Sequence, residues 1–168
     1  MRRMTATALF IISAYPALAY SQERIADIHL DYARGTTSHQ NSWGAGAALQ
    51  LTWGGSHAPA KVSTSIGGDY MKQENSGPSQ TSASLDIALQ PGGSSAFTPY
   101  AGGSVSSNWS GGATKQWTGA RLGLESLAGF QFKPSPDASI AWKAEERFGY
   151  VRGQEHTLAT RLGILISI

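Results

Sequence analysis

Apolar and polar residues alternate with a period of two along most of the chain after residue 22, and segments rich in Gly, Pro, Ser and Asn interrupt the alternation. Such alternation is typical of β-strands that have one apolar and one polar face. Eight runs of this kind can be drawn, at 23–34, 43–54, 60–72, 80–90, 96–107, 116–132, 138–151 and 157–168. The sequence therefore predicts an all-β protein of eight strands.

The segments between these runs alternate between two types, as the connections of an up-and-down meander do. Three are short and carry proline: 55–59, 91–95 and 133–137. The other four are polar, with Ser, Asn, Gly or charged residues: 35–42, 73–79, 108–115 and 152–156. Both termini then lie at the end with the proline turns, which in an outer-membrane barrel faces the periplasm, while the four loops face the exterior.

Charged side chains gather on the polar faces of the runs. In the first run, Asp27, His29 and Asp31 alternate with Ile28 and Leu30. Taken together, the polar faces carry six acids and five bases: Asp27, Asp31, Asp69, Asp86, Glu125, Glu145, Lys61, Arg121, Lys143, Arg147 and Arg161. Side chains just fill the interior of a closed eight-stranded barrel, so these charges would converge there and would have to pair.

The alternation alone does not decide which face is outside. A soluble β-sandwich has the same period, and a soluble lipocalin-like barrel would turn its aliphatic face inward. In a lipid bilayer the apolar face must point outward, so the charged face fills the lumen. For that case we expect Glu125 and Glu145 to accept hydrogen bonds from Arg121, Arg147 or Arg161.

Aromatic residues gather near the two ends of the runs. Those near the polar loops are Tyr32, Trp43, Tyr70, Trp117, Phe148 and Tyr150. Those near the proline turns are Trp53, Phe97, Phe130, Phe132 and Trp142. Two aromatic belts around an aliphatic band are what a bilayer selects, because amphipathic rings favour the headgroup region. The belts favour an eight-stranded antiparallel up-and-down transmembrane β-barrel over the soluble alternatives.

The first nineteen residues resemble a cleavable signal peptide. Arg2 and Arg3 precede a short apolar core, and Ala17-Leu18-Ala19 provides small residues for cleavage. We therefore expect a signal peptide over 1–19 and a barrel domain over 20–168. Without Arg2 and Arg3, eleven Lys and Arg face eleven Asp and Glu, so no excess of positive charge indicates a nucleic-acid partner. The chain has no Cys, which excludes disulfides and cysteine-based metal or catalytic sites.

Four motifs in about the last 70 residues carry a family resemblance. They are Phe97-Thr98-Pro99-Tyr100-Ala101-Gly102-Gly103, the segment from Leu127 to Pro136, Ala144-Glu145 with Arg147, and the segment from His156 to Ile164. This half of the chain resembles the small OmpA-like and OmpX-like outer-membrane β-barrel family, a porin-type β-barrel domain. The resemblance implies a place in the bacterial outer membrane, contact with its lipid and lipopolysaccharide, and the barrel-assembly machinery as a partner during biogenesis.

Three features depart from the family pattern. The chain ends on Ile168, where family members usually end on an aromatic residue. Glu146 stands where the alternation sends a side chain to lipid, unless a bulge turns it inward. Pro99 cannot donate a ladder hydrogen bond, so we expect it near the rim of the barrel.

No catalytic, cofactor-binding or metal site stands out in the sequence. Lipid A deacylases of similar size use a His-x-Ser pair, and none of the four histidines, His29, His39, His57 and His156, is followed by x-Ser. Asp27, His29 and Asp31 lie about 6–7 Å apart along one strand face, and the sequence indicates no further ligand beside them. We therefore expect no enzyme.

The leading functional hypothesis is a structural outer-membrane barrel with a charge-filled lumen, porin-like in family. The first alternative is a surface adhesin or receptor that binds an external ligand through loops 35–42 and 108–115, the second of which contains Trp109. A lipid A-modifying enzyme is the third hypothesis.

Overall fold

The computed structural model describes residues 23–54, 58–74, 77–92, 95–111, 120–135 and 137–168. These residues form one closed antiparallel β-barrel in which the strands follow each other in chain order. The strands are β1 Glu23–Gly35, β2 Asn41–Trp53, β3 Ala60–Gln73, β4 Ser79–Pro91, β5 Phe97–Gly111, β6 Arg121–Phe132, β7 Ile140–Val151 and β8 His156–Ser167. The all-β, eight-stranded, up-and-down fold predicted from the sequence is confirmed.

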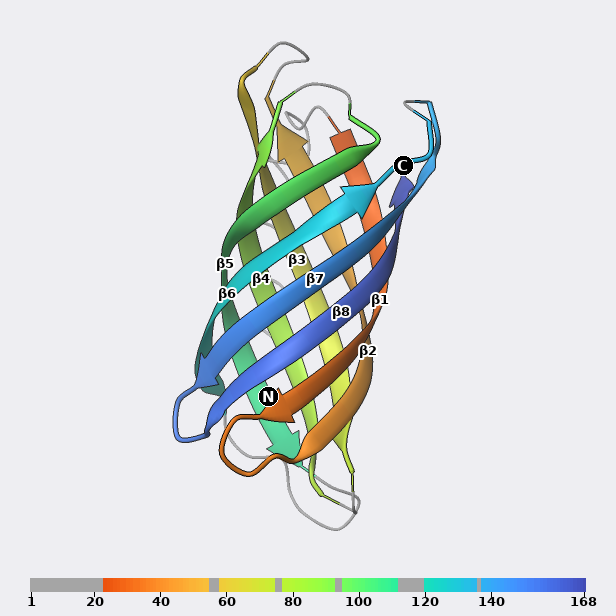
Figure 1. Cartoon of the computed structure of the whole chain (residues 1–168). Helices are drawn as coiled ribbons and strands as arrows, with labels where there is room; N and C mark the ends of the chain where they lie inside the picture. Colours follow the sequence, from red (N-terminus) through yellow and green to blue (C-terminus); the bar gives the residue numbers. More distant parts are fainter. Residues whose placement is uncertain (1–22, 55–57, 75–76, 93–94, 112–119, 136) are drawn as a thin grey trace, which may run out of the picture.

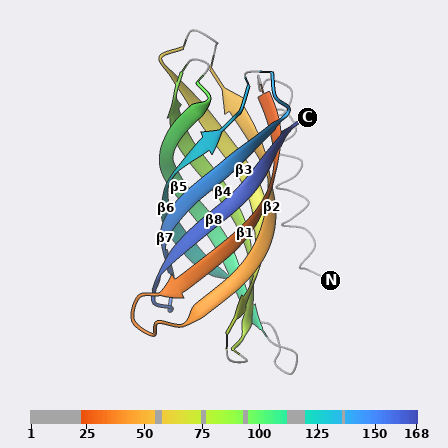
Figure 2. The same cartoon turned by 45° about the vertical axis from the view of Figure 1, so that its right-hand side comes forward.

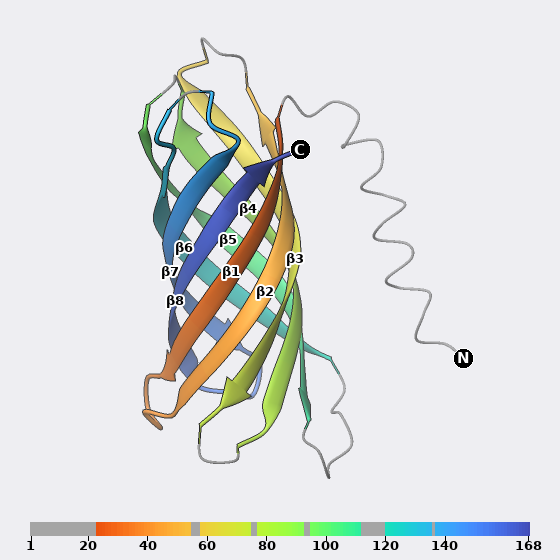
Figure 3. The same ribbon diagram turned by 90° about the vertical axis from the view of Figure 1, so that its right-hand side faces the viewer.

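The barrel closes where the first and last strands pair. Ile25 lies opposite Ser167, and Gly35 lies opposite Thr157. The strands are steeply tilted around the barrel (Figure 1), and β1 and β8 run side by side in all three views (Figures 1, 2 and 3). The start of β1 and the end of β8 therefore lie at one end. We call it the turn end; the described residues between strands there are 54, 58–59, 92, 95–96, 133–135 and 137–139. The opposite end is the loop end, with the described residues 36–40, 74, 77–78, 120 and 152–155.

Two strand boundaries differ from the sequence prediction by more than two residues. β5 continues to Gly111 because Trp109 pairs with Thr81 and Gly111 pairs with Ser79. The backbone ladder thus extends through a Ser- and Asn-rich stretch that looks like a loop in the sequence, and Trp109 belongs to a strand. β6 begins at Arg121, whereas the sequence predicted a start at 116. Residues 116–119 lie outside the described part of the chain.

The outer surface of the barrel is apolar. Ile28, Leu30 and Leu162 are more than half exposed, as are many other large side chains on the same face. Pro99 is the third residue of β5, near the turn end, where the sequence placed it. Glu146 points outward without a bulge, since the β7–β8 register is unbroken, and accepts a hydrogen bond from Thr160 Oγ1 at 2.7 Å. The alternative that a bulge turns Glu146 inward is therefore wrong. In the described ranges no helix is long and apolar enough to cross a membrane.

Candidate functional site: the charged lumen

The lumen site starts from three alternate residues of β1. Asp27, His29 and Asp31 are all at most 4 % exposed, because alternate side chains of a strand point to the same face and this face is the interior. The strand register places His29 opposite Gly46 of β2, and Gly46 opposite Asp69 of β3. The missing side chain at Gly46 lets His29 and Asp69 meet across the intervening strand. A Cβ there would clash with both of them.

Both ring nitrogens of His29 contact carboxylates. Nδ1 lies 3.0 Å from Asp27 Oδ1, and Nε2 lies 2.7 Å from Asp69 Oδ1. Nε2 is also 3.7 Å from Asp31 Oδ2. Ser82 Oγ donates to the other oxygen of Asp69 at 3.0 Å. His29 thus lies at the centre of a carboxylate cluster, as a shared inward face of Asp27, His29 and Asp31 suggested, and Asp69 completes it.

Arg161 of β8 holds two of these acids. Its Nε donates to Asp31 Oδ1 at 2.7 Å, and one terminal nitrogen donates to Asp69 Oδ1 at 2.8 Å. The sequence predicted Glu125 or Glu145 as acceptors for Arg161, and for this arginine the prediction is wrong. The closing register explains the difference, because it sets Arg161 directly opposite Asp31.

Arg147 of β7 contacts three other acids. Its terminal nitrogens donate to Asp86 and, at 2.9 Å, to Glu125, while Nε donates to Glu145. The guanidinium group, with its five donors in a planar fork, suits such a position between carboxylates from different strands. Glu125 and Glu145 are therefore the acceptors for Arg147 that the sequence analysis expected.

Lys143 joins the two clusters. Its Nζ lies 2.6 Å from Asp27 Oδ2 and 3.7 Å from Glu145 Oε2. Tyr100 donates its phenolic proton to Glu145 at 2.8 Å and is buried. In the sequence Tyr100 stands out only as part of a family motif. Its inward position in β5 is the signal for its role in the network.

Two predicted members of the charged interior stay outside the network. Neither Arg121 nor Lys61 makes an ion pair with any residue in the described ranges. Arg121 is the first residue of β6, about 13 Å along the strand from Glu125 at 3.3 Å per residue. It therefore lies at the rim of the loop end, and the expected pairing of Arg121 with Glu125 or Glu145 is wrong.

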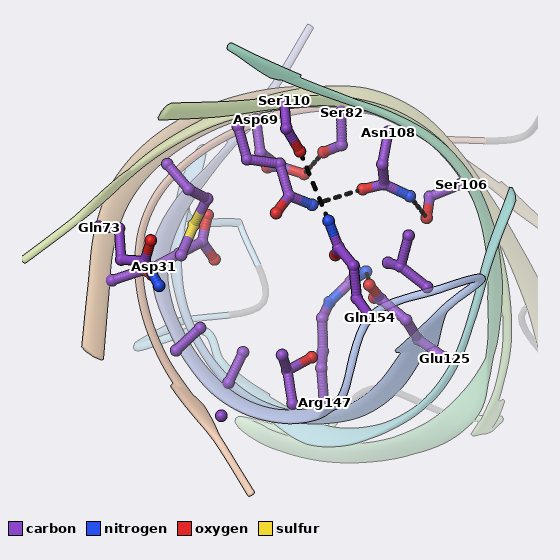
Figure 4. Close-up of a pocket in the computed structure, with 18 of the residues that line it drawn as sticks. Asp31, Asp69, Gln73, Ser82, Ser106, Asn108, Ser110, Glu125, Arg147 and Gln154 are labelled. Atoms are coloured by element: carbon purple, nitrogen blue, oxygen red, sulfur yellow. Dashed lines mark hydrogen bonds and ion pairs between the residues drawn. The ribbon is translucent and has the colours of Figure 1, made fainter. Parts of the chain in front are cut away.

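The charge network separates two cavities. A cavity of about 320 Å³ opens at the loop end, and one of about 220 Å³ opens at the turn end. They share no lining residue. Figure 4 shows the loop-end cavity, with Asp31, Asp69, Glu125 and Arg147 around it and polar side chains such as Gln73 and Asn108 nearer the rim. Between the two cavities the buried charges occupy the lumen and leave a small cavity of about 20 Å³ beside Asp86, Lys143 and Glu145.

The outward aromatic side chains lie toward both strand ends. At the loop end, Tyr32 and Trp43 have ring centroids 4.5 Å apart; Tyr70, Phe148 and Tyr150 are exposed there as well. At the turn end, Phe97 stacks on Phe130 at 4.7 Å, and Phe132 and Trp142 are exposed, while Trp53 is half-buried and donates to Thr64. Trp117 lies outside the described residues.

At the loop end, Glu155 connects two loops. Its carboxylate accepts from the Ser38 hydroxyl and from the backbone N–H groups of Thr37 and Ser38, the latter two at 2.6 and 2.7 Å. These hydrogen bonds favour the ionised form, so they hold the pKa of Glu155 below its ordinary value of 4.5. The 36–40 loop is thereby attached to the connection between β7 and β8.

The histidines that the structure describes do not form a nucleophilic pair with serine. Both nitrogens of His29 contact carboxylates, as described above. His156 is exposed on the outer face, where its ring stacks on Phe148 at 5.4 Å and packs against Tyr150 at 5.1 Å. His57 lies outside the described residues.

No protein-family model and no curated protein sequence matches the chain. Several solved structures are similar over nearly the whole barrel. Neisserial surface protein A matches with a TM-score of 0.61 at 14% identity, over 86% of this chain and 95% of that one. The outer membrane enzyme PagL matches with a TM-score of 0.61 at 12% identity, over 84% and 99%. Ail, the attachment invasion locus protein of Yersinia pestis, matches with a TM-score of 0.54 at 13% identity, over 87% and 98%. At these identities the likeness shows the shared fold, that of the small outer-membrane β-barrels.

Proposed function

We propose that this chain is a structural protein of the bacterial outer membrane whose lumen is closed to ions by its own side chains. The observation that carries the proposal is the network across the middle of the barrel. Arg147, Arg161 and Lys143 each contact at least two carboxylates and are buried. These cations and the carboxylates that hold them fill the cross-section of the lumen and leave no continuous path for a hydrated ion.

The outer surface of the barrel supports the proposed location in the membrane. An apolar band between aromatic belts surrounds a polar interior, which is the reverse of a soluble barrel. In this orientation the loop end faces the exterior and the turn end the periplasm. Outer-membrane lipid and lipopolysaccharide then contact the band, residues 1–19 serve as the export signal, and the barrel-assembly machinery inserts the folded domain over 20–168.

Planar-bilayer recordings test the closed lumen. We expect no steady conductance from the parent protein. Glu145→Ala removes a carboxylate that Arg147, Lys143 and Tyr100 all contact, and we expect it to admit a small ion current or to destabilise the barrel. Glu146→Ala, which removes a neighbouring acid on the outer face, is the matched control and should show no steady conductance. A large steady conductance from the parent would replace this proposal with an open, porin-like channel.

The loop end supports a second candidate, a surface receptor or adhesin. Its cavity of about 320 Å³ is lined mainly by amide, hydroxyl and charged side chains and opens to the side that faces the exterior in this orientation. The similar barrel of Ail is an attachment protein whose structure holds a heparin analogue. Binding of whole cells that display the protein to immobilised glycans, compared with cells that lack it, tests this candidate.

A further inference from the structure

Three metal-ligating side chains converge beside the loop-end cavity, and two of them, Asp31 and Asp69, line it. His29 and Asp31 come from β1 and Asp69 from β3, and one ligand atom of each lies within 4.8 Å of the others. His29 Nε2 is 2.7 Å from Asp69 Oδ1 and 3.7 Å from Asp31 Oδ2. A tetrahedral zinc ion with ligands at about 2.0–2.2 Å holds them about 3.3–3.6 Å apart, so small shifts of the side chains would accommodate it.

One of these atoms lacks a hydrogen bond. Asp31 is only 4 % exposed, and its Oδ2 makes no hydrogen bond with any described residue, although its Oδ1 accepts from Arg161. A buried carboxylate oxygen normally has a donor, because nothing else replaces the water that it has lost. This oxygen is directed toward His29 and is free to bind a cation.

The charge balance of the network points the same way. Six carboxylates take part in its ion pairs, from Asp27, Asp31, Asp69, Asp86, Glu125 and Glu145. Three basic side chains oppose them, those of Lys143, Arg147 and Arg161. A protonated His29 would reduce the excess of negative charge but would not remove it. Buried charge must be compensated, and a divalent cation at His29 would supply what the side chains lack.

The side chains that contact these three ligands are arranged as the outer partners of a metal site usually are. A metal-bound histidine usually donates its second ring N–H to a carboxylate, which fixes the ring and its tautomer. Here His29 Nδ1 lies 3.0 Å from Asp27, which Lys143 holds in turn at 2.6 Å. Ser82 donates to Asp69 Oδ2. Asp69 Oδ1 accepts from Arg161 at 2.8 Å, so the ion would share this oxygen with the guanidinium group. Gly46 provides the space between His29 and Asp69.

We propose that the loop-end cavity binds a divalent transition-metal ion of the zinc class through His29 Nε2, Asp31 Oδ2 and Asp69 Oδ1. Imidazole nitrogen selects such metals over calcium and magnesium, which take oxygen ligands. Arg161 keeps its bond to Asp31 Oδ1. Asp31 and Asp69 line the cavity, so the ion enters from the loop end and keeps its fourth position open to that side. The site goes beyond the closed lumen and does not depend on it.

Zinc titration of the folded, full-length barrel in detergent micelles tests the site by calorimetry. We expect the parent to bind one zinc ion per barrel. In His29→Gln the affinity should fall about 100-fold or more, because even the outer partners of metal ligands are worth about 10–100-fold. His156→Gln, which changes an exposed histidine on the outer face, is the matched control and should bind like the parent. Absence of saturable binding by the parent, or equal affinity of parent and His29→Gln, would overturn the proposal.

A second measurement covers the case in which His29→Gln does not fold, as judged by heat-modifiable gel migration. X-ray absorption at the zinc edge of the loaded parent reports the ligands directly. We expect one imidazole nitrogen and otherwise oxygen ligands. A shell of oxygen alone, or one with two or more imidazoles, contradicts the assignment to His29.

Discussion

At the scale of single residues, the charged lumen depends on glycines placed opposite large polar side chains. Gly46 lies between His29 and Asp69, and a Cβ at Gly163 would lie 3.0 Å from Asp27 Oδ1. In the narrow interior of an eight-stranded barrel, a long side chain on one strand requires a short one beside it. These glycines are therefore part of the site, although they carry no chemistry.

The first prediction concerns Gly46→Ala. Its methyl group would occupy the space in which His29 meets Asp69, and overpacking of this kind costs about 1–3 kcal/mol. Urea titration of folding into lipid vesicles, followed by tryptophan fluorescence, measures the change in the free energy of unfolding. Gly103→Ala is the control, because the nearest atom to its new Cβ is the Glu125 carbonyl oxygen at an ordinary 3.4 Å. Equal stability of the two variants would show that His29 and Asp69 do not need the gap.

At the scale of strands and loops, the period of two predicted nearly everything about which face a residue lies on. All six acids expected inside the barrel line the lumen network, and Glu146 points outward. The pairs inside the lumen were harder to predict, because each depends on the register of strands far apart in the sequence. Arg161 binds Asp31 rather than Glu145 because β8 closes onto β1, and alternation contains no information on that register.

Strand β8 gives the second prediction, a test of depth in the bilayer. Leu162 is 59 % exposed on the outer face and pairs with Leu30 and Ala144 within the aliphatic band. Leu162→Arg should destabilise the barrel in vesicles by about 2–4 kcal/mol, since an arginine near the midplane is costly. Leu158→Arg, on the same face beside Phe148, should cost only about 0–1 kcal/mol because it is near the interface. If both variants fold as well as the parent, the outer face of β8 does not contact lipid.

The loop contact of Glu155 gives the third prediction, a dependence on pH. Because hydrogen bonds from Ser38 and Thr37 lower the pKa of Glu155, the contact is fully formed above the ordinary value of 4.5. It is lost as the pH falls through the lowered pKa, when the carboxyl group gains a proton. NMR shifts of the Thr37 and Ser38 amides should titrate with a midpoint below 4.5. In Glu155→Gln this transition should be absent, and a midpoint above the ordinary value would contradict the assignment.

At the scale of the whole molecule, the barrel has its apolar face outside and its charged face inside, the reverse of a soluble barrel. Its place in a membrane follows from this arrangement. Large apolar side chains cover the outside, and the charged residues of the network fill the inside. In water this arrangement would expose one continuous apolar band, whereas a bilayer covers it. The alternation of apolar and polar residues allowed either face to be outside. The positions of the aromatic residues in the sequence favoured the apolar face.

The fourth prediction is that the protein fractionates with outer membranes and begins near Tyr20 after export. Its migration on gels should shift on boiling, as folded barrels resist detergent until they are heated. Mass spectrometry of the mature protein checks the cleavage site after Ala19. Recovery of a soluble periplasmic protein would contradict the membrane assignment and favour a lipocalin-like barrel.

The pairing of the first strand with the last also determines when the interior becomes sealed. Asp27 and Asp31 are synthesised early in the chain. Lys143, the partner of Asp27, follows 116 residues after it, and Arg161, the partner of Asp31, follows 130 residues after it. Until β8 docks between β7 and β1, Asp31 and Asp69 lack Arg161 and the barrel is open along one side, so water reaches these carboxylates. Docking of β8 brings Arg161 to Asp31 and Asp69, and water is expelled in the same step. We therefore expect a chain truncated before β8 to leave the barrel open along one side and its interior accessible to water.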